Sequence, residues 1–267
     1  MITLDEVPIS PGCRARLAGW QAEVNKLRSY KERGAEAALK FGSRNNRKNK
    51  TFQEIRAALE RMCCGARRCC YCEDSAADEV EHIAPKALFP ERVFDWTNYL
   101  YACGPCNGPK NNRYSYVTPS GEMKEFIRTR AGRLMAPPKG IDALIDPRRE
   151  NPLDFMQLDL AGTFCFVPIA ADPVLRRRAV WTIELLDLNK PTLTRARASA
   201  CFNFENALRS YAEQKLRNVT VSELEKTKLM ILAQPHPTVF LEMQRSRLAD
   251  PLFVDIPEAR AWRFMPA

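Results

Sequence analysis

Histidine is scarce in this sequence, and several common features are missing from it. The 267 residues include two histidines, so chemistry that needs an imidazole near neutral pH must use His82 or His236. No uninterrupted apolar run of 18 or more residues occurs, so we expect no transmembrane helix. The first residues include acids but no apolar signal segment, so we expect a cytoplasmic protein. Because a glycine-rich phosphate loop is also missing, the chain itself is not expected to hydrolyse ATP.

Acidic residues are outnumbered by basic ones. The sequence has 41 Lys and Arg against 32 Asp and Glu, which gives a net charge of +9. An excess of positive charge favours polyanionic partners such as nucleic acids. With 45% hydrophobic and 27% charged residues, the composition is typical of an ordinary globular protein with a core. The charge alone is a weak indication, and it gains weight only beside the cysteines.

Ten cysteines are present, although no export signal places the chain in an oxidising compartment. A reducing compartment favours a metal site over a disulfide framework. Two Cys-x-x-Cys pairs stand out, and their members are Cys69, Cys72, Cys103 and Cys106. Four thiolates at this spacing suit a tetrahedral zinc ion, which is closed to substrate and therefore structural. The alternative is a set of free core thiols. The roles of three neighbouring cysteines stay open, namely Cys63, Cys64 and Cys70.

Catalytic candidates lie between and just after the two cysteine pairs. His82 is the candidate general base, because imidazole takes a proton from water near neutral pH. Glu81 and Asn107 offer oxygen donors that suit Mg²⁺ or Mn²⁺ rather than a soft ion. We expect Asn98 to fix a loop by hydrogen bonds that orient His82. A lone histidine is often merely structural, and an asparagine after a cysteine pair is often only a helix cap.

Two basic residues complete the expected site. Lys110 lies three residues after Asn107 and therefore on the same helical face, where it is expected to contact a phosphate. Arg113 is the second expected nucleic-acid contact. The polar loop from 41 to 50 has four basic residues and no acid. That loop is equally consistent with a solvated connector and with a further phosphate contact.

Hydrophobic periodicity predicts a mostly helical α+β fold in three regions, 1–65, 66–115 and 116–267. The expected helices cover 13–33, 51–62, 172–188, 192–218, 222–233 and 238–248, with a short helix beginning at Gly104. The helix at 51 is expected to open on a capping box formed by Thr51 and Glu54. A strand is expected over 80–83, ended by Pro85. The runs 153–160 and 163–167 predict a β-hairpin. His236 is expected in a turn that enters a helix.

The cysteine segment resembles the zinc-containing branch of the HNH endonucleases. The segments that carry the resemblance are Cys69-Cys-Tyr-Cys72, Glu81-His-Ile-Ala-Pro85, Trp96-Thr-Asn-Tyr-Leu100 and Cys103-Gly-Pro-Cys-Asn-Gly-Pro-Lys110. The resemblance implies a small ββα-metal core, braced by zinc, in which His82 activates water while Glu81 and Asn107 hold one divalent cation. Asn98 matches the middle asparagine of the family pattern. This chain has Asn107 where many members have histidine.

Looser motifs elsewhere are similar to the retron-associated and Septu-type HNH nucleases. They include Asp146-Pro-Arg148 and Ile183-Glu-Leu-Leu-Asp-Leu-Asn189, together with the N-terminal helical lead. Those proteins are bacterial antiphage effectors that work with an ABC-type ATPase partner. The resemblance implies that the C-terminal helices dock the ATPase or close over substrate. Two rival functions remain open, a zinc-stabilised nucleic-acid-binding module without catalysis and a scaffold subunit.

Overall fold

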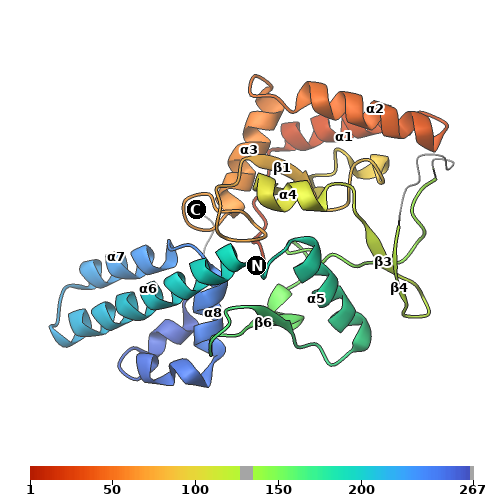
Figure 1. Cartoon of the computed structure of the whole chain (residues 1–267). Helices are drawn as coiled ribbons and strands as arrows, with labels where there is room; N and C mark the ends of the chain where they lie inside the picture. The colour runs from red at the N-terminus through yellow and green to blue at the C-terminus, as the bar shows by residue number, and fades with distance from the viewer. Residues whose placement is uncertain (127–134, 265–267) are drawn as a thin grey trace.

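The N-terminal helices lie at one end of the molecule and the long C-terminal helices at the other (Figure 1). A computed structural model describes residues 1–126 and 135–264. Within these ranges the fold is mostly helical, and three small sheets lie among the helices. The mostly helical α+β class predicted from the sequence is therefore confirmed. The division into three regions stays a prediction, because one set of buried side chains runs through all of them.

The N-terminal region holds three helices, which are α1 (Pro11–Asn25), α2 (Tyr30–Arg44) and α3 (Lys50–Met62). The single helix expected over 13–33 was wrong, because the chain breaks between Asn25 and Tyr30. Ser29 and Glu32 form a capping box that starts α2 there, with the Ser29 side chain accepting from the Glu32 amide. The expected break at residue 41 was also wrong, since α2 continues to Arg44 and buries Phe41.

Helix α3 starts one residue earlier than expected, and a different residue caps it. The Asn49 side chain accepts hydrogen bonds from the amides of Thr51 and Phe52, so Asn49 is the N-cap. The capping box expected between Thr51 and Glu54 does not form. Glu54 instead accepts from the main-chain amide and hydroxyl of Ser10, which fastens the start of α1 to α3. A tertiary contact therefore replaced the local one.

Two antiparallel strands and a helix form the centre of the molecule. Strand β1 (Glu79–His82) pairs with β2 (Tyr99–Ala102), and α4 (Gly104–Lys110) follows directly after β2. The register sets His82 opposite Tyr99. The strand expected over 80–83 is thus confirmed with a shift of one residue, and the helix at Gly104 is confirmed. The chain from 83 to 98 crosses between the strands and includes the short 3-10 helices Pro90–Arg92 and Trp96–Asn98.

Two further sheets connect this centre to the C-terminal half. The first contains β3 (Ser115–Val117), β4 (Met123–Glu125) and β5 (Ile141–Asp142), in the order β4-β3-β5. The second is the expected hairpin, in which β6 (Met156–Leu158) pairs with β7 (Phe166–Pro168). Its strands are shorter than predicted, because Pro152–Asp154 forms a 3-10 helix before β6.

The C-terminal half is helical, as predicted. It contains α5 (Pro173–Leu185), α6 (Pro191–Leu216), α7 (Val221–Leu232) and α8 (Pro237–Arg245), followed by the 3-10 helices Arg247–Phe253 and Pro257–Ala261. His236 is the N-cap residue of α8, which confirms the predicted helix-entry turn. Its Nε2 lies 3.3 Å from Asp74 Oδ1, so the start of α8 contacts the loop after Cys72. Within the described ranges, no helix is both long enough and apolar enough to span a bilayer.

Candidate functional site

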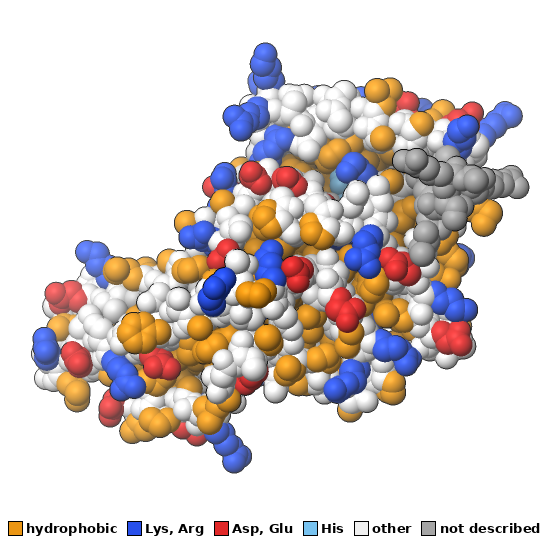
Figure 2. All heavy atoms as spheres, in the orientation of Figure 1, with side chains coloured by type: hydrophobic (Ala, Val, Ile, Leu, Met, Phe, Trp, Pro, Cys, Tyr) orange, Lys and Arg blue, Asp and Glu red, His pale blue; other side chains and the backbone are white. Residues whose placement is uncertain are grey.

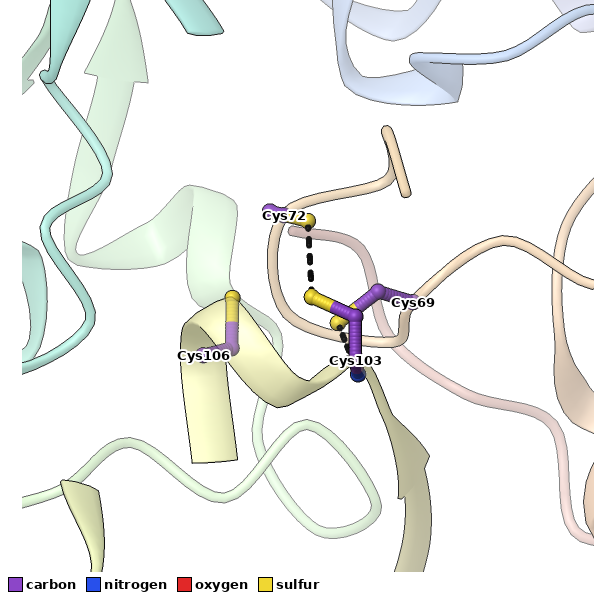
Figure 3. A group of neighbouring side chains, drawn as sticks. All are labelled: Cys69, Cys72, Cys103 and Cys106. Carbon is purple, nitrogen blue, oxygen red and sulfur yellow. Dashed lines mark hydrogen bonds between the residues drawn. The ribbon is translucent and has the colours of Figure 1, made fainter. Parts of the chain in front are cut away.

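The four cysteines of the two Cys-x-x-Cys pairs meet in the folded chain (Figure 3). Cys69 and Cys72 lie in the loop after α3, Cys103 follows β2, and Cys106 lies on α4. All four are buried, and their sulfur atoms lie within 4.8 Å of one another. The sequence prediction that these four residues form one cluster is confirmed.

The sulfur spacing fits zinc. A tetrahedral ion with Zn–S bonds of about 2.3 Å has S···S edges of about 3.8 Å. The Sγ atoms of Cys72 and Cys103 lie 3.8 Å apart. The main-chain amide of Cys103 donates to Cys69 Sγ at 3.3 Å, an interaction that stabilises a thiolate. Four buried sulfurs leave no coordination position open, so an ion here would hold the loop, β2 and α4 together without taking part in catalysis.

Neighbouring cysteines do not belong to this cluster. The Sγ atoms of Cys63 and Cys70 lie 3.9 Å apart and form a separate buried pair. Cys63 also donates to the carbonyl oxygen of Leu59 one turn earlier in α3. These two thiols pack as small apolar side chains between α3 and β2. Cys63 and Cys70 thus lie outside the four-cysteine cluster, a separation that the spacing of the cysteines in the sequence did not reveal.

A cavity of about 270 Å³ opens between β1 and the end of α4. Three of the predicted site residues line it, namely Glu81, His82 and Asn107. Adjacent residues of a strand normally point to opposite faces. Here β1 ends at His82, and the chain turns towards Pro85, so both side chains border one space. Lining residues that the sequence reading did not single out include Glu79, Lys86, Asn111 and Asn112.

His82 is held in one tautomer. Its Nε2 lies 3.0 Å from the carbonyl oxygen of Val93, which is an acceptor only, so Nε2 carries the proton. Its Nδ1 is buried and has no hydrogen-bond partner within the described residues. The ring is clamped edge-on by Phe41 at 4.5 Å and by Tyr99 at 5.0 Å between centroids. The imidazole therefore presents a bare lone pair on a ring whose orientation is fixed.

Burial keeps His82 neutral. The residue is 2% exposed, and its pKa is lowered from the ordinary 6.5 to about 3. Desolvation is the largest cause and the positive charge of Lys86 adds to it, whereas the hydrogen bond to Val93 acts in the opposite direction. A neutral imidazole at physiological pH has the protonation state that a general base requires before it accepts a proton.

Asn98 fixes the loop that carries this acceptor. It is fully buried, and its Oδ1 accepts from the Ala84 amide at 2.7 Å. Its Nδ2 donates to the carbonyl oxygens of Ala84 and Arg92, at 3.1 and 3.0 Å. Arg92 directly precedes Val93, so these bonds hold in place the loop segment whose Val93 carbonyl accepts from His82. The hydrogen bonds match the loop-fixing geometry expected of Asn98.

Glu81 and Lys110 form a buried ion pair. Lys110 is 1% exposed, and its Nζ donates to Glu81 Oε1 at 2.5 Å and to the carbonyl oxygen of His82 at 2.8 Å. Lys110 does not extend outward to a phosphate as expected, because its ammonium points inward and joins α4 to β1. The sequence spacing placed Lys110 on the correct helix, but it did not indicate that Glu81 would be its buried partner.

Asn107 is oriented by a residue that the sequence analysis missed. Its Nδ2 donates to Glu79 Oε2 at 2.5 Å. The amide oxygen of Asn107 lies on the other side of the carboxamide and takes no part in this bond. Glu79 and Glu81 are two apart on β1 and therefore share a face towards α4. That two-residue spacing on a short strand was the signal that could have revealed Glu79. Arg113, the second expected nucleic-acid contact, is 48% exposed and pairs with Glu125 at 3.1 Å.

The donor set suits a hard divalent cation. Glu81 keeps one carboxylate oxygen outside its contact with Lys110, and Asn107 keeps its amide oxygen. Mg²⁺ is commonly bound by one or two protein oxygens, with water and phosphate oxygens completing its shell. Glu81 and Asn107 therefore fit such an ion, and His82, whose buried Nδ1 has no hydrogen-bond partner among the described residues, lines the same cavity. Among the described residues, the acidic and histidine side chains at this cavity do not form a group of three or more that could enclose an ion by themselves.

One comparison with known proteins gives a match. The chain is 33% identical over 91 residues to the Septu protein PtuB of Bacillus thuringiensis, a stretch that covers 29% of this chain and 35% of that protein. The match thus spans about a third of the relative's length and relates part of this chain to a Septu protein. No protein-family model matches the sequence, and no solved structure matches it.

Proposed function

We propose that this protein is a metal-dependent HNH endonuclease that hydrolyses phosphodiester bonds in nucleic acid. The observation that carries the proposal is the bare, buried Nδ1 of His82 at the cavity that Glu81 and Asn107 also line. A base and two hard oxygen donors at one cavity are the groups that activate a water and neutralise a phosphate. The cysteine cluster holds α4, which carries Asn107, against the end of β2, and β2 is the partner strand of β1, which carries Glu81 and His82.

Each side chain has one task in the proposed reaction. His82 accepts a proton from the attacking water at Nδ1, and its Nε2 hydrogen bond to Val93 keeps the ring in place. Glu81 and Asn107 would hold Mg²⁺ or Mn²⁺, which stabilises negative charge on the scissile phosphate and leaving oxygen. Lys110 positions Glu81, and Glu79 positions Asn107. Water attack then breaks the P–O bond, and the leaving oxygen takes up a proton from solvent.

We further propose an antiphage role with an ATPase partner. Part of the chain is similar to a Septu protein, and the motif resemblance points to effectors that act beside an ABC-type ATPase. The net charge of +9 suits a polyanionic substrate in either case. The helical C-terminal half offers the surface on which such a partner would dock, and the isolated chain is then expected to cleave more slowly than the complex.

The test is cleavage of DNA and RNA by the purified chain, alone and together with an ABC-type ATPase where a neighbouring gene encodes one. With Mg²⁺ or Mn²⁺ the native protein should cut, and His82→Ala should reduce the rate by about 10²-fold or more. Zinc content and the unfolding transition of the variant should match the native protein. Unchanged cleavage by His82→Ala would remove the assigned base.

The second histidine supplies a matched control. His236 is also buried, but it lies at the start of α8, away from the residues that line the cavity. Its backbone is left-handed with φ of 59°, a conformation that asparagine tolerates. His236→Asn should therefore cut at close to the native rate. Loss of cleavage in both variants alike would indicate a general structural effect rather than loss of a base.

A binding module without catalysis is the second candidate. The observation that favours it is the buried Glu81–Lys110 pair, which neutralises one of the two oxygen donors that a cation would need. This alternative predicts salt-sensitive binding with no metal-dependent turnover, even with the partner present. Cleavage that depends on His82 and on added Mg²⁺ or Mn²⁺ excludes it.

A further inference from the structure

The cavity at His82 is the middle of three adjoining cavities. Asn111 and Asn112 line all three, so the spaces meet at this turn. One neighbour, of about 450 Å³, lies against α2 and shares Lys86 with the central cavity. The other, of about 440 Å³, shares Gly108 with the central cavity but not with the first neighbour, and it is lined by Arg113. Together they form a continuous depression, which we name the α2 cleft, with the candidate base at its centre.

Helix α2 supplies one wall of the α2 cleft, and three of its lining residues are small, namely Gly34, Ala35 and Ala38. With Lys31 they follow the i, i+3, i+4, i+7 pattern of one helical face, and Tyr30 lines the same cavity. A Cβ atom added at Gly34 would meet no atom within 4 Å, so this wall is open. Figure 2 shows a hollow between the N-terminal helices and α4, with histidine surface at its floor and a basic side chain beside it.

Basic groups border the α2 cleft on both sides of the central cavity. Within the described residues, neither Lys31 nor Lys86 forms an ion pair with an acid. The Lys86 ammonium lies 5.4 Å from the centroid of the Phe41 ring, the same ring that packs on His82. Arg113, which pairs with Glu125, lines the cavity of about 440 Å³. An unpaired ammonium next to a neutral imidazole is well placed for an anionic ligand.

The turn that joins the cavities is strained. Asn111 has φ of 38° and ψ of −120°, a backbone conformation that residues other than glycine rarely adopt. Its amide donates to the carbonyl oxygen of Asn107, which fixes this geometry at the end of α4. Strain of this kind persists where the surroundings impose it, and it concentrates at ligand sites. The unpartnered Nδ1 of His82 is an independent sign that the central cavity accepts a ligand.

We propose that the α2 cleft binds one strand of the nucleic-acid substrate across the active site. Lys31 and Lys86 contact phosphates on one side of the scissile bond, and Arg113 contacts a phosphate on the other side. The small face of α2 lets the sugar–phosphate backbone approach closely. The inference rests on the proposed nuclease function and adds the path of the strand, with Lys86 taking the phosphate contact that the sequence had assigned to Lys110.

Binding measurements test the path separately from cleavage. Short labelled single-stranded DNA and RNA are titrated with the full chain carrying His82→Ala, so that no substrate is consumed. Adding Lys86→Ala should weaken binding about fivefold to tenfold and lower the slope of log K against log salt by about one. Lys226→Ala is the matched control, because Lys226 is exposed on α7 and lines none of these cavities. It removes the same charge, and the slope should stay unchanged.

A second pair of variants tests the path without changing charge. Ala35→Trp would fill the α2 cleft from the exposed face of α2 and should weaken binding at least tenfold, with unfolding unchanged. Ala22→Trp places the same ring on the exposed face of α1, outside the cleft, and should bind normally. Equal effects of Lys86→Ala and Lys226→Ala, normal binding by Ala35→Trp, or no binding at low salt would each overturn the α2 cleft as the binding path.

The two proposals fail in different ways. If the native chain binds through the α2 cleft but never cuts, even with the ATPase, the path stands and the nuclease function fails. If cleavage depends on His82 while the cleft variants bind and cut normally, the nuclease function stands and the path is wrong.

Discussion

The Nε2 atom of His82 lies 3.0 Å from the carbonyl oxygen of Val93, eleven residues later in the chain. The Tyr99 hydroxyl donates to the same oxygen at 2.5 Å, so Val93 accepts from two side chains. Asn98 holds the neighbouring carbonyl of Arg92. The Val93 carbonyl therefore fixes both the tautomer and the orientation of the His82 imidazole. Its own position depends on the loop between β1 and β2.

The protonation of His82 gives the first prediction. Because burial and the Lys86 charge lower its pKa to about 3, His82 should remain the neutral Nε2–H tautomer from about pH 5 to pH 8. Nitrogen-15 NMR of histidine-labelled protein reads this directly, since the chain has two histidines. Lys86→Met removes a neighbouring positive charge and should raise the pKa of His82. Titration of native His82 near pH 6.5 would contradict the assigned environment.

The same shift makes stability depend on pH. The folded state binds this proton more weakly than the unfolded state, so stability falls as pH falls below the unfolded value of 6.5. Between pH 7.5 and pH 5, native protein should lose about 2 kcal/mol more than His82→Leu, by 1.36 kcal/mol per pH unit below 6.5. Urea unfolding at the two pH values measures the difference. Burial also lowers the pKa of His236, but that contribution is common to both proteins and cancels.

The buried pair of Glu81 and Lys110 gives a stability prediction. Lys110→Met leaves the Glu81 carboxylate buried without a partner and should cost about 3–5 kcal/mol. Adding Glu81→Gln to Lys110→Met should recover part of the loss, because the unpaired charge is then removed. Urea unfolding of both single variants and the double variant gives the coupling energy. Additive losses would show that the two side chains do not interact as the geometry indicates.

Zinc gives a further prediction. The native chain should contain about one zinc per molecule, and Cys106→Ser should lose it and unfold at a lower temperature, because α4 is then no longer tied to β2. Cys165→Ser serves as the control, since Cys165 lies outside the cluster. Metal analysis and thermal unfolding report both effects. Full zinc content in Cys106→Ser would exclude the four-sulfur assignment.

Local sequence signals predicted most helices and the hairpin. Helix α5 begins after Asp172, whose side chain accepts from the amides of Val174 and Leu175, and this signal is contained within a few residues. Signals of this kind failed where a distant residue competed. Glu54 bonds Ser10 instead of capping its own helix, so the boundary at Asn49 depended on a contact between α1 and α3.

The sequence by itself determined which four cysteines cluster and the short list of candidate groups, because the spacing within each Cys-x-x-Cys pair already sets two sulfurs at one point. Only the tertiary structure decided what each group faces. Burial made His82 neutral and turned Lys110 inward onto Glu81, whereas Lys86 stayed at the rim. Solvent exposure and the partner of a charge depend on segments far apart in the chain, which no local pattern records.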